Sequence, residues 1–372
     1  RIKMVEWLAG NRIKGTTAER PNLGLPSGSV GGWKELGRFN LGSDDTGGFD
    51  KIINFATKDF IQVIGMVRPS TDPQMRVGTT TPDSSANKYA SNQSHNWGSW
   101  GSGDINSNHT QSGGGFTSDG SFFNMYILNK TGQQKTAIQQ TCNANGTGVG
   151  STTNVPAMTN YVWKYIETPK IDRLSISHSS GTLYSSGTEV VVLGWDPTDT
   201  HTDNFWEELG SADLASGKLE VTFAAKKYLW VEVYGKNGNS NIDQVVINLG
   251  AGSYDGGNNY ANRYSADWGS GATLANRPNI NVFDQGSGSG AGDNESFFSS
   301  MFIGNHADRE KLIIMNSVSD NANTSSGSSS STPPSWETAA KWGNTQQATF
   351  IRVENKGSGV LVEGKIKVWG HD

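Results

Sequence analysis

An internal repeat constrains this sequence more than any other feature. The segment Gly187–Gly210, GTEVVVLGWDPTDTHTDNFWEELG, contains the end of one unit and the start of the next. Its last residues, WEELG at 206–210, repeat WKELG at 33–37. Its strand-like first part is echoed by GKIKVWG at 364–370, near the end of the chain. Self-similarity at a long, fixed period identifies an architecture before any single motif does. The sequence therefore predicts two successive copies of one folding unit.

Further matches support an internal duplication. Each lies about 170 residues from its partner: FATK at 55–58 with FAAK at 223–226, YASN at 89–92 with YANR at 260–263, SFF at 121–123 with SFF at 296–298, and Arg173 with Arg352. A nearly constant offset with small drift is what two divergent copies with loop insertions produce. We expect an N-terminal arm and linker at 1–32, a first repeat at 33–197 and a second repeat at 198–372.

Both copies have the sequence pattern of all-β domains. Segments such as FIQVIGMV and YLWVEVYG are rich in β-branched and aromatic residues, and Leu229, Val231 and Val233 alternate with other side chains. Alternation with a period of two is typical of strands. No segment has a sustained helical period, and turn residues separate about eight strands in each copy. Two tandem jelly-roll-like β-sandwich domains are the best prediction, and other sandwich topologies stay open.

The composition limits the classes of function. The 372 residues include 12 Trp, 14 Phe and 10 Tyr, which is too many for a disordered chain. A net charge of −5 without a basic cluster argues against a nucleic-acid surface. No apolar run approaches the roughly 20 residues that span a bilayer, and no signal peptide is recognisable after Arg1. We therefore expect no nucleic-acid partner and no membrane span.

No group of residues has the pattern of a catalytic, cofactor or metal site. The histidines are not spaced like zinc ligands, so we predict solvated loop positions for His95, His109, His178, His201, His306 and His371. Cys142, the single cysteine, lacks a nucleophile signature. The acidic turns at Asp44 and Asp293 follow no known calcium loop. Glu232 aligns with Ile64, so a duplicated catalytic acid is not supported. We expect a protein that is not an enzyme and has no cofactor.

Aromatic side chains are the remaining candidates for function. Tyr89 and Tyr260, like Trp97 and Trp268, recur in both copies, so we predict that they anchor a long loop onto the core. Trp100 has no counterpart and is expected at the surface. Exposed rings on sandwich loops form platforms for sugars or sockets for a partner subunit. Trp97, Trp100 and Trp268 are therefore the predicted ligand or interface aromatics, and truncating Trp268 should lower thermal stability more than truncating Trp100.

The N-terminal arm carries a small apolar patch. Val5, Trp7 and Leu8 precede a polar stretch and the linker PNLGLPSGSVGG. One interpretation is an extra strand that folds back on its own domain. The interpretation that we favour is an assembly arm that packs on a neighbouring subunit, since a patch of this size gains little free energy alone.

Several motifs carry a family resemblance. KYLWV, NYANRYS, REKL, AAKWGN, the closing KVWG, the junction EVVVLGWDPTDTHTDNFWEEL and the arm's LAGNRIKGTTAER cover nearly the whole chain. Together they resemble tandem-repeat β-sandwich structural proteins of marine viruses with prokaryotic or archaeal hosts. The resemblance implies a virion structural protein, and it brings no catalytic or binding residues with it.

Two classes of function follow from these observations. The first is a capsid, decoration or fibre subunit in the virion, whose partners are further copies of itself and other virion proteins. The alternative is a lectin-like protein that binds host surface glycans from a virion or a cell. Ordered rings on an exposed loop would favour the lectin, whereas surfaces buried between copies would favour assembly.

Overall fold

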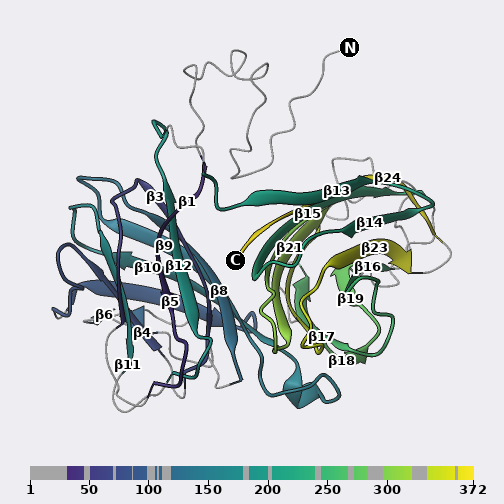
Figure 1. The fold of residues 1–372 in the computed structure, drawn as a ribbon, viewed down its shortest axis with the longest axis horizontal. Coiled ribbons are helices and arrows are strands. Elements are labelled where there is room, and N and C mark those ends of the chain that lie inside the picture. The colour runs from purple at the N-terminus through teal and green to yellow at the C-terminus, as the bar shows by residue number, and fades with distance from the viewer. Residues whose placement is uncertain are drawn as a thin grey trace.

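The structure is a computed structural model built from β-strands (Figure 1). It describes residues 32–45, 51–69, 73–85, 87–98, 105–106, 109–110, 119–178, 184–199, 203–238, 244–266, 272–283, 296–320, 333–356 and 359–372. Within these residues no α-helix occurs, and the one helical element is a 3₁₀ turn, η2 (Thr152–Asn154). Every strand pairing is antiparallel. The all-β prediction is confirmed.

The first half of the chain forms a large sheet and a small sheet. In spatial order, the large sheet contains β1 (Lys34–Asn40), β12 (Glu189–Trp195), β3 (Phe60–Val67), β8 (Ser121–Leu128), β9 (Lys135–Asn143), β10 (Ala157–Tyr165), β5 (Tyr89–His95) and β6 (Ile105–Asn106). The small sheet contains β2 (Lys51–Asn54), β11 (Arg173–His178), β4 (Pro73–Gly78) and β7 (His109–Thr110). We call this pair of sheets the first sandwich.

The second half repeats the arrangement. Its large sheet contains β13 (Glu207–Asp213), β24 (Leu361–His371), β15 (Tyr228–Asn237), β20 (Ser296–Gly304), β21 (Lys311–Ser319), β22 (Ser335–Trp342), β17 (Tyr260–Ala266) and β18 (Ala272–Arg277). Its small sheet contains β14 (Lys218–Thr222), β23 (Phe350–Lys356), β16 (Gln244–Gly250) and β19 (Ile280–Phe283). We call it the second sandwich. Each sandwich thus has more strands than the eight expected, because short strands form within segments that look like loops in the sequence.

Equivalent side chains make the same contacts in both sandwiches. The amide of Asn129 follows β8 and donates to the carbonyl oxygens of Lys58 (2.9 Å) and Ile171 (3.0 Å). The amide of Asn305 follows β20 and donates to those of Lys226 (2.8 Å) and Ala348 (3.1 Å). Both asparagines therefore tie the large sheet to the segment that leads into a strand of the small sheet. These shared contacts identify which positions in the two large sheets correspond to each other.

The two repeated tyrosines are buried, as predicted. The hydroxyl of Tyr89 accepts a hydrogen bond from the backbone N–H of Val77 (2.9 Å) and donates one to the carbonyl of the same residue (2.8 Å). The hydroxyl of Tyr260 makes the equivalent pair of bonds with Leu249. Because a buried hydroxyl needs partners, these bonds let each ring lie in the core while its polar tip holds a small-sheet strand.

Three hydrophobic cores stabilise the part of the chain that the structure describes. One lies between the sheets of the first sandwich and includes Val63 and Phe123; a second lies in the second sandwich and includes Val231 and Phe297. The third, which we call the joint core, combines residues from the outer faces of both large sheets. Figure 1 shows the first sandwich on the left and the second on the right, with their large sheets adjoining near the centre. Each large sheet is therefore apolar on both faces, unlike a sheet with one solvated face.

Candidate functional site

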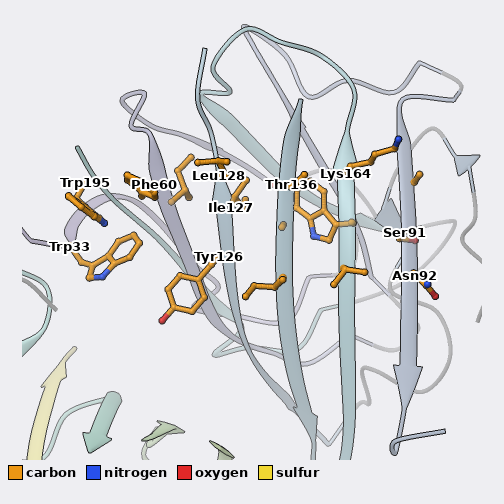
Figure 2. Close-up of a pocket in the computed structure, with 16 residues that line it drawn as sticks. Trp33, Phe60, Ser91, Asn92, Tyr126, Ile127, Leu128, Thr136, Lys164 and Trp195 are labelled. Carbon is orange, nitrogen blue, oxygen red and sulfur yellow. The ribbon is translucent and has the colours of Figure 1, made fainter. Parts of the chain in front are cut away.

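The described residues form an apolar groove of about 830 Å³ (Figure 2). It lies on the outer face of the first sandwich's large sheet, across β3, β8, β9, β10 and β5. Its lining is mostly carbon: Trp33, Phe60, Ile61, Ala90, Ser91, Asn92, Tyr126, Ile127, Leu128, Thr136, Ala137, Ile138, Val162, Trp163, Lys164 and Trp195. We refer to it as the outer groove.

The floor of the outer groove follows from strand alternation. Ala137 and Trp163 point into the sandwich core, so their neighbours Ile138 and Val162 must point outward. Ile138 is 61% exposed and Val162 is 39% exposed, although both are aliphatic and directly paired across β9 and β10. Burying such side chains is favourable by about 25 cal/mol per Å² of apolar area. The floor therefore offers a surface that gains free energy when another apolar surface covers it.

Aromatic rings form one wall of the outer groove. Phe60 stacks on Trp195 with ring centroids 4.8 Å apart, and Trp33 lies 6.4 Å from Trp195 and 5.9 Å from Tyr126. Figure 2 shows Trp33, Phe60, Trp195 and Tyr126 grouped on one side of the sheet. Trp33 and Trp195 stand just before β1 and at the end of β12, so two distant chain segments build this wall. The polar groups among the lining residues are few, which suits an apolar occupant better than a charged one.

The equivalent face of the second sandwich is covered. Counted along the paired strands, Tyr126, Ile138 and Val162 correspond to Phe302, Ile314 and Ala339. Ile314 and Ala339 are 0% exposed and lie in the joint core. Their cover is the first sandwich. Corresponding positions on this face are thus exposed in the first sandwich and covered in the second.

The cover is a row of side chains at the opposite end of the first large sheet. Met66, Phe122 and Cys142 are direct cross-strand neighbours on β3, β8 and β9, and none is more than 1% exposed. The ring of Phe122 packs directly on Gly304, where a Cβ would stand only 2.8 Å from the ring, so any larger residue there would displace it. The thiol of Cys142 is 3.7 Å from the carbonyl oxygen of Ala340. We call these three residues the covering row.

Polar contacts surround the joint core. The ammonium of Lys341 donates to the carbonyl oxygens of Ala144 (3.1 Å) and Gly146 (2.9 Å). The indole N–H of Trp97 donates to the Glu337 carboxylate at 2.6 Å. Hydrogen bonds beside an apolar contact fix its register, while the burial of apolar area supplies most of its free energy. The two sandwiches therefore have a defined relative position.

A buried charge cluster closes one end of this contact. The carboxylate of Glu189 in the first sandwich pairs with Arg38 and, at 3.2 Å, with Lys227 of the second. His306 lies 3.9 Å from the same carboxylate. Burial, together with the neighbouring cations, lowers the pKa of His306 to about 3, so its imidazole is neutral at pH 7. The prediction that His306 is a solvated loop residue was wrong, because the loop after β20 packs against the other sandwich.

The remaining candidates have mixed outcomes. Trp97 is half-buried and belongs to the contact between the sandwiches. Cys142 is buried in the joint core, and desolvation raises the pKa of its thiol to about 12, so it is not a reactive nucleophile at pH 7. Trp100, Trp268 and the arm residues Val5, Trp7 and Leu8 lie outside the described residues.

The outer groove was not predicted from the sequence. Its signal is present in TAIQQTCN and NYVWKYIE, where Ala137-Ile138 and Val162-Trp163 place apolar side chains on both faces of neighbouring strands. Among the described residues, no cluster of three or more His, Cys, Asp or Glu side chains could hold a metal ion. No helix in the described part of the chain is long and apolar enough to cross a membrane.

Comparisons with known proteins do not place this chain in a family. No protein-family model matches it, and no curated protein matches it. Among solved structures, the translocator domain of the autotransporter NalP from Neisseria meningitidis aligns with 77% of this chain and 88% of its own. The identity is 8% and the TM-score is 0.12, so this similarity carries no argument about fold or function.

Proposed function

We propose that this protein is a structural component of a virus particle, a capsid, decoration or fibre subunit that acts by self-assembly without catalysis. The proposal rests on two corresponding surfaces, one in each sandwich, of which one is covered and the other is open. The outer face of the large sheet docks a protein surface in the second sandwich, whereas the corresponding outer groove of the first sandwich is open. An open apolar face of this size on a folded domain is typical of an interaction surface.

We also propose that each sandwich is a jelly roll. Without β5, β6, β9 and β10, the eight remaining strands of the first sandwich have the spatial orders β1-β12-β3-β8 and β2-β11-β4-β7. Successive strands then alternate between the sheets except at the central β4-β7 connection, as in two linked Greek keys. The four removed strands extend the large sheet. Viral capsid proteins and lectins both use this fold, so it supports the proposal without choosing between them.

An internal duplication accounts for the two sandwiches. All twelve strands of the first sandwich have counterparts in the same spatial order in the second. The equivalent asparagine contacts and buried tyrosines described above add to this order. Two copies of one docking unit in a chain suit a building block, because each chain then brings two related surfaces to an assembly.

The lectin-like alternative has one observation in its favour. Phe60, Trp195, Trp33 and Tyr126 form an aromatic wall, and aromatic faces bind the apolar faces of sugar rings. If the protein binds host glycans there, Trp195→Ala should abolish retention on a glycan array without lowering the melting temperature of the second sandwich. Equal binding by Trp195→Ala and the unaltered chain would reject this alternative for the outer groove.

Sedimentation velocity over a wide concentration range tests self-assembly directly. We expect the full chain to form particles or oligomers larger than one chain, visible as regular objects by negative-stain electron microscopy. A chain that stays monomeric up to the highest soluble concentration would refute the proposal. A chain that lacks residues 1–30 tests the arm, since loss of assembly with both sandwiches still folded would assign Val5, Trp7 and Leu8 to it.

A further inference from the structure

We infer that copies of this chain associate head to tail, with a row of the second sandwich in one copy seated in the outer groove of the next. The row consists of Tyr234, Phe298 and Val318, and we call it the free row. This inference rests on the proposed function and specifies the surfaces through which self-assembly occurs. Its basis is that each sandwich has a row of apolar side chains and a face that can receive such a row, and the folded chain joins only one row to one face.

The free row corresponds to the covering row by position. Phe60 and Leu128 are directly paired at one end of the first large sheet, as Tyr228 and Gly304 are in the second. Six residues further along the strands, the first sheet presents Met66, Phe122 and Cys142. At the same distance, the second sheet presents Tyr234, Phe298 and Val318 as direct cross-strand neighbours. The two rows therefore occupy the same place on equivalent sheets.

The two rows differ in what covers them. Every side chain of the covering row is buried against the second sandwich. In the free row, Tyr234 is 44% exposed, Val318 is 39% exposed and Phe298 is half-buried. A tyrosine, a phenylalanine and a valine side by side on three strands make a continuous apolar surface. Such a surface is uncommon on a solvated sheet face and marks a contact site.

The outer groove is the matching receptor. Within one chain, Phe122 of the covering row packs on Gly304, and Cys142 lies beside the carbonyl of Ala340. The joint core that contains these contacts also includes Phe302, Ile314 and Ala339. The corresponding residues of the first sandwich are Tyr126, Ile138 and Val162, which line the outer groove. Each sandwich thus carries one row and one receptor face. The contact within the chain uses the row of the first sandwich and the receptor of the second, so one row and one receptor remain.

Two oppositely charged side chains favour the free row as the occupant of the outer groove. Lys341 beside the covered receptor bonds to the carbonyl of Ala144, two residues beyond Cys142 in the covering row. The corresponding residues are Lys164 at the outer groove and Asp320, two residues beyond Val318 in the free row. Both are exposed and opposite in charge. If the free row docked in the same way as the covering row, the ammonium of Lys164 would lie next to the carboxylate of Asp320. The attraction between these charges favours the correct register.

The geometry of the association follows from the use of two different surfaces. A head-to-tail contact between unlike patches is heterologous, and its repetition gives a closed ring or an open chain of subunits. A two-fold symmetric pair would instead seat the free row of each copy in the outer groove of the other. The size of the unaltered assembly separates the two arrangements, because a symmetric pair stops at two chains whereas head-to-tail association adds further chains.

The test uses two charge substitutions and sedimentation velocity. Ile138→Asp blocks the outer groove and leaves the free row intact, and Val318→Asp does the reverse. Burying a carboxylate in an apolar contact is costly, so each variant should associate at least ~10-fold more weakly than the full unaltered chain. The matched controls are Ile52→Asp and Val360→Asp, which alter exposed aliphatic residues elsewhere on the first and second sandwich. They should associate like the unaltered chain.

Mixing the two variants shows whether the outer groove and the free row contact each other. A one-to-one mixture of Ile138→Asp and Val318→Asp should form a pair of chains and nothing larger, because only one groove and one row remain functional. Near-UV circular dichroism of each variant establishes that the fold is retained, and Ile138→Thr and Val318→Thr serve if an aspartate variant does not fold. Unaltered association of both single variants, or no recovery in the mixture, would overturn the inference.

Two outcomes separate this inference from the proposed function. If the unaltered chain does not associate at all, the proposed function fails. If it associates and the groove and row variants behave like their controls, assembly stands and head-to-tail docking is refuted. Loss of association only when residues 1–30 are removed would assign the contact to the arm and would equally refute it.

Discussion

The contact between the two sandwiches can be tested at Phe122. This side chain is fully buried in the joint core, yet it lies on the outer face of its own sheet and not in the core of its sandwich. Phe122→Ala therefore removes a large ring from the contact and leaves the first sandwich's own core unchanged. The residue isolates the stability of the joint from the stability of either domain.

The expected effect can be estimated from the burial. A fully buried Phe that is truncated to Ala typically costs about 3 to 5 kcal/mol, of which part is lost transfer energy and part is the cavity that remains. The ring lies directly over Gly304, which cannot fill the space because it has no side chain. We therefore expect a value in the upper part of this range for opening the joint, and little change in the stability of each separate sandwich.

Urea unfolding and limited proteolysis measure the opening. In Phe122→Ala, a first transition should appear in which the sandwiches separate, and proteases should cut the segment between Asp196 and Asn204 earlier. The matched control is Phe298→Ala, since Phe298 occupies the corresponding place in the second sandwich but is only half-buried. At a concentration where the chain is monomeric, the control should cost less than about 1 kcal/mol. Equal losses for the two variants, or a single unchanged transition for Phe122→Ala, would refute the reasoning.

Two further predictions concern pH. Burial raises the pKa of the Glu232 carboxyl to about 7, so the contribution of this group to the free energy of unfolding is full below pH 4.5 and is lost as the pH rises through 7. Between pH 5 and pH 8, the free energy of unfolding of Glu232→Gln in urea should therefore rise by about 2 kcal/mol relative to the unaltered chain. A pH-independent difference would contradict this. The pKa of His306 is lowered to about 3, so the contribution of its neutral imidazole to the free energy of unfolding is present above pH 6.5 and is lost as the pH falls. Between pH 7 and pH 5, the free energy of unfolding of the unaltered chain should therefore fall by about 2 kcal/mol relative to His306→Gln. Parallel pH profiles of these two proteins would show that the imidazole is not buried in its neutral form.

Local sequence patterns determine the strands and the anchors of this protein. Alternation in YLWVEVYG places Leu229, Val231 and Val233 on one face, and these residues do lie in the core of the second sandwich. Tyr89 and Tyr260 recur at matching positions because both must bury a ring and satisfy a hydroxyl. Side-chain alternation and hydrogen-bonding demand are properties of a short segment, so they can be predicted from the segment itself.

Only the tertiary structure decides what faces the second side of each large sheet. Ile138 and Ile314 occupy corresponding positions on corresponding strands, yet one is 61% exposed and the other is fully buried. His306 likewise has the sequence context of an ordinary loop residue, and only the first sandwich beside it buries the imidazole. A period of two separates the two faces of a strand but does not specify what packs against either face. That depends on contacts between residues more than a hundred positions apart, which arise only when both sandwiches have folded.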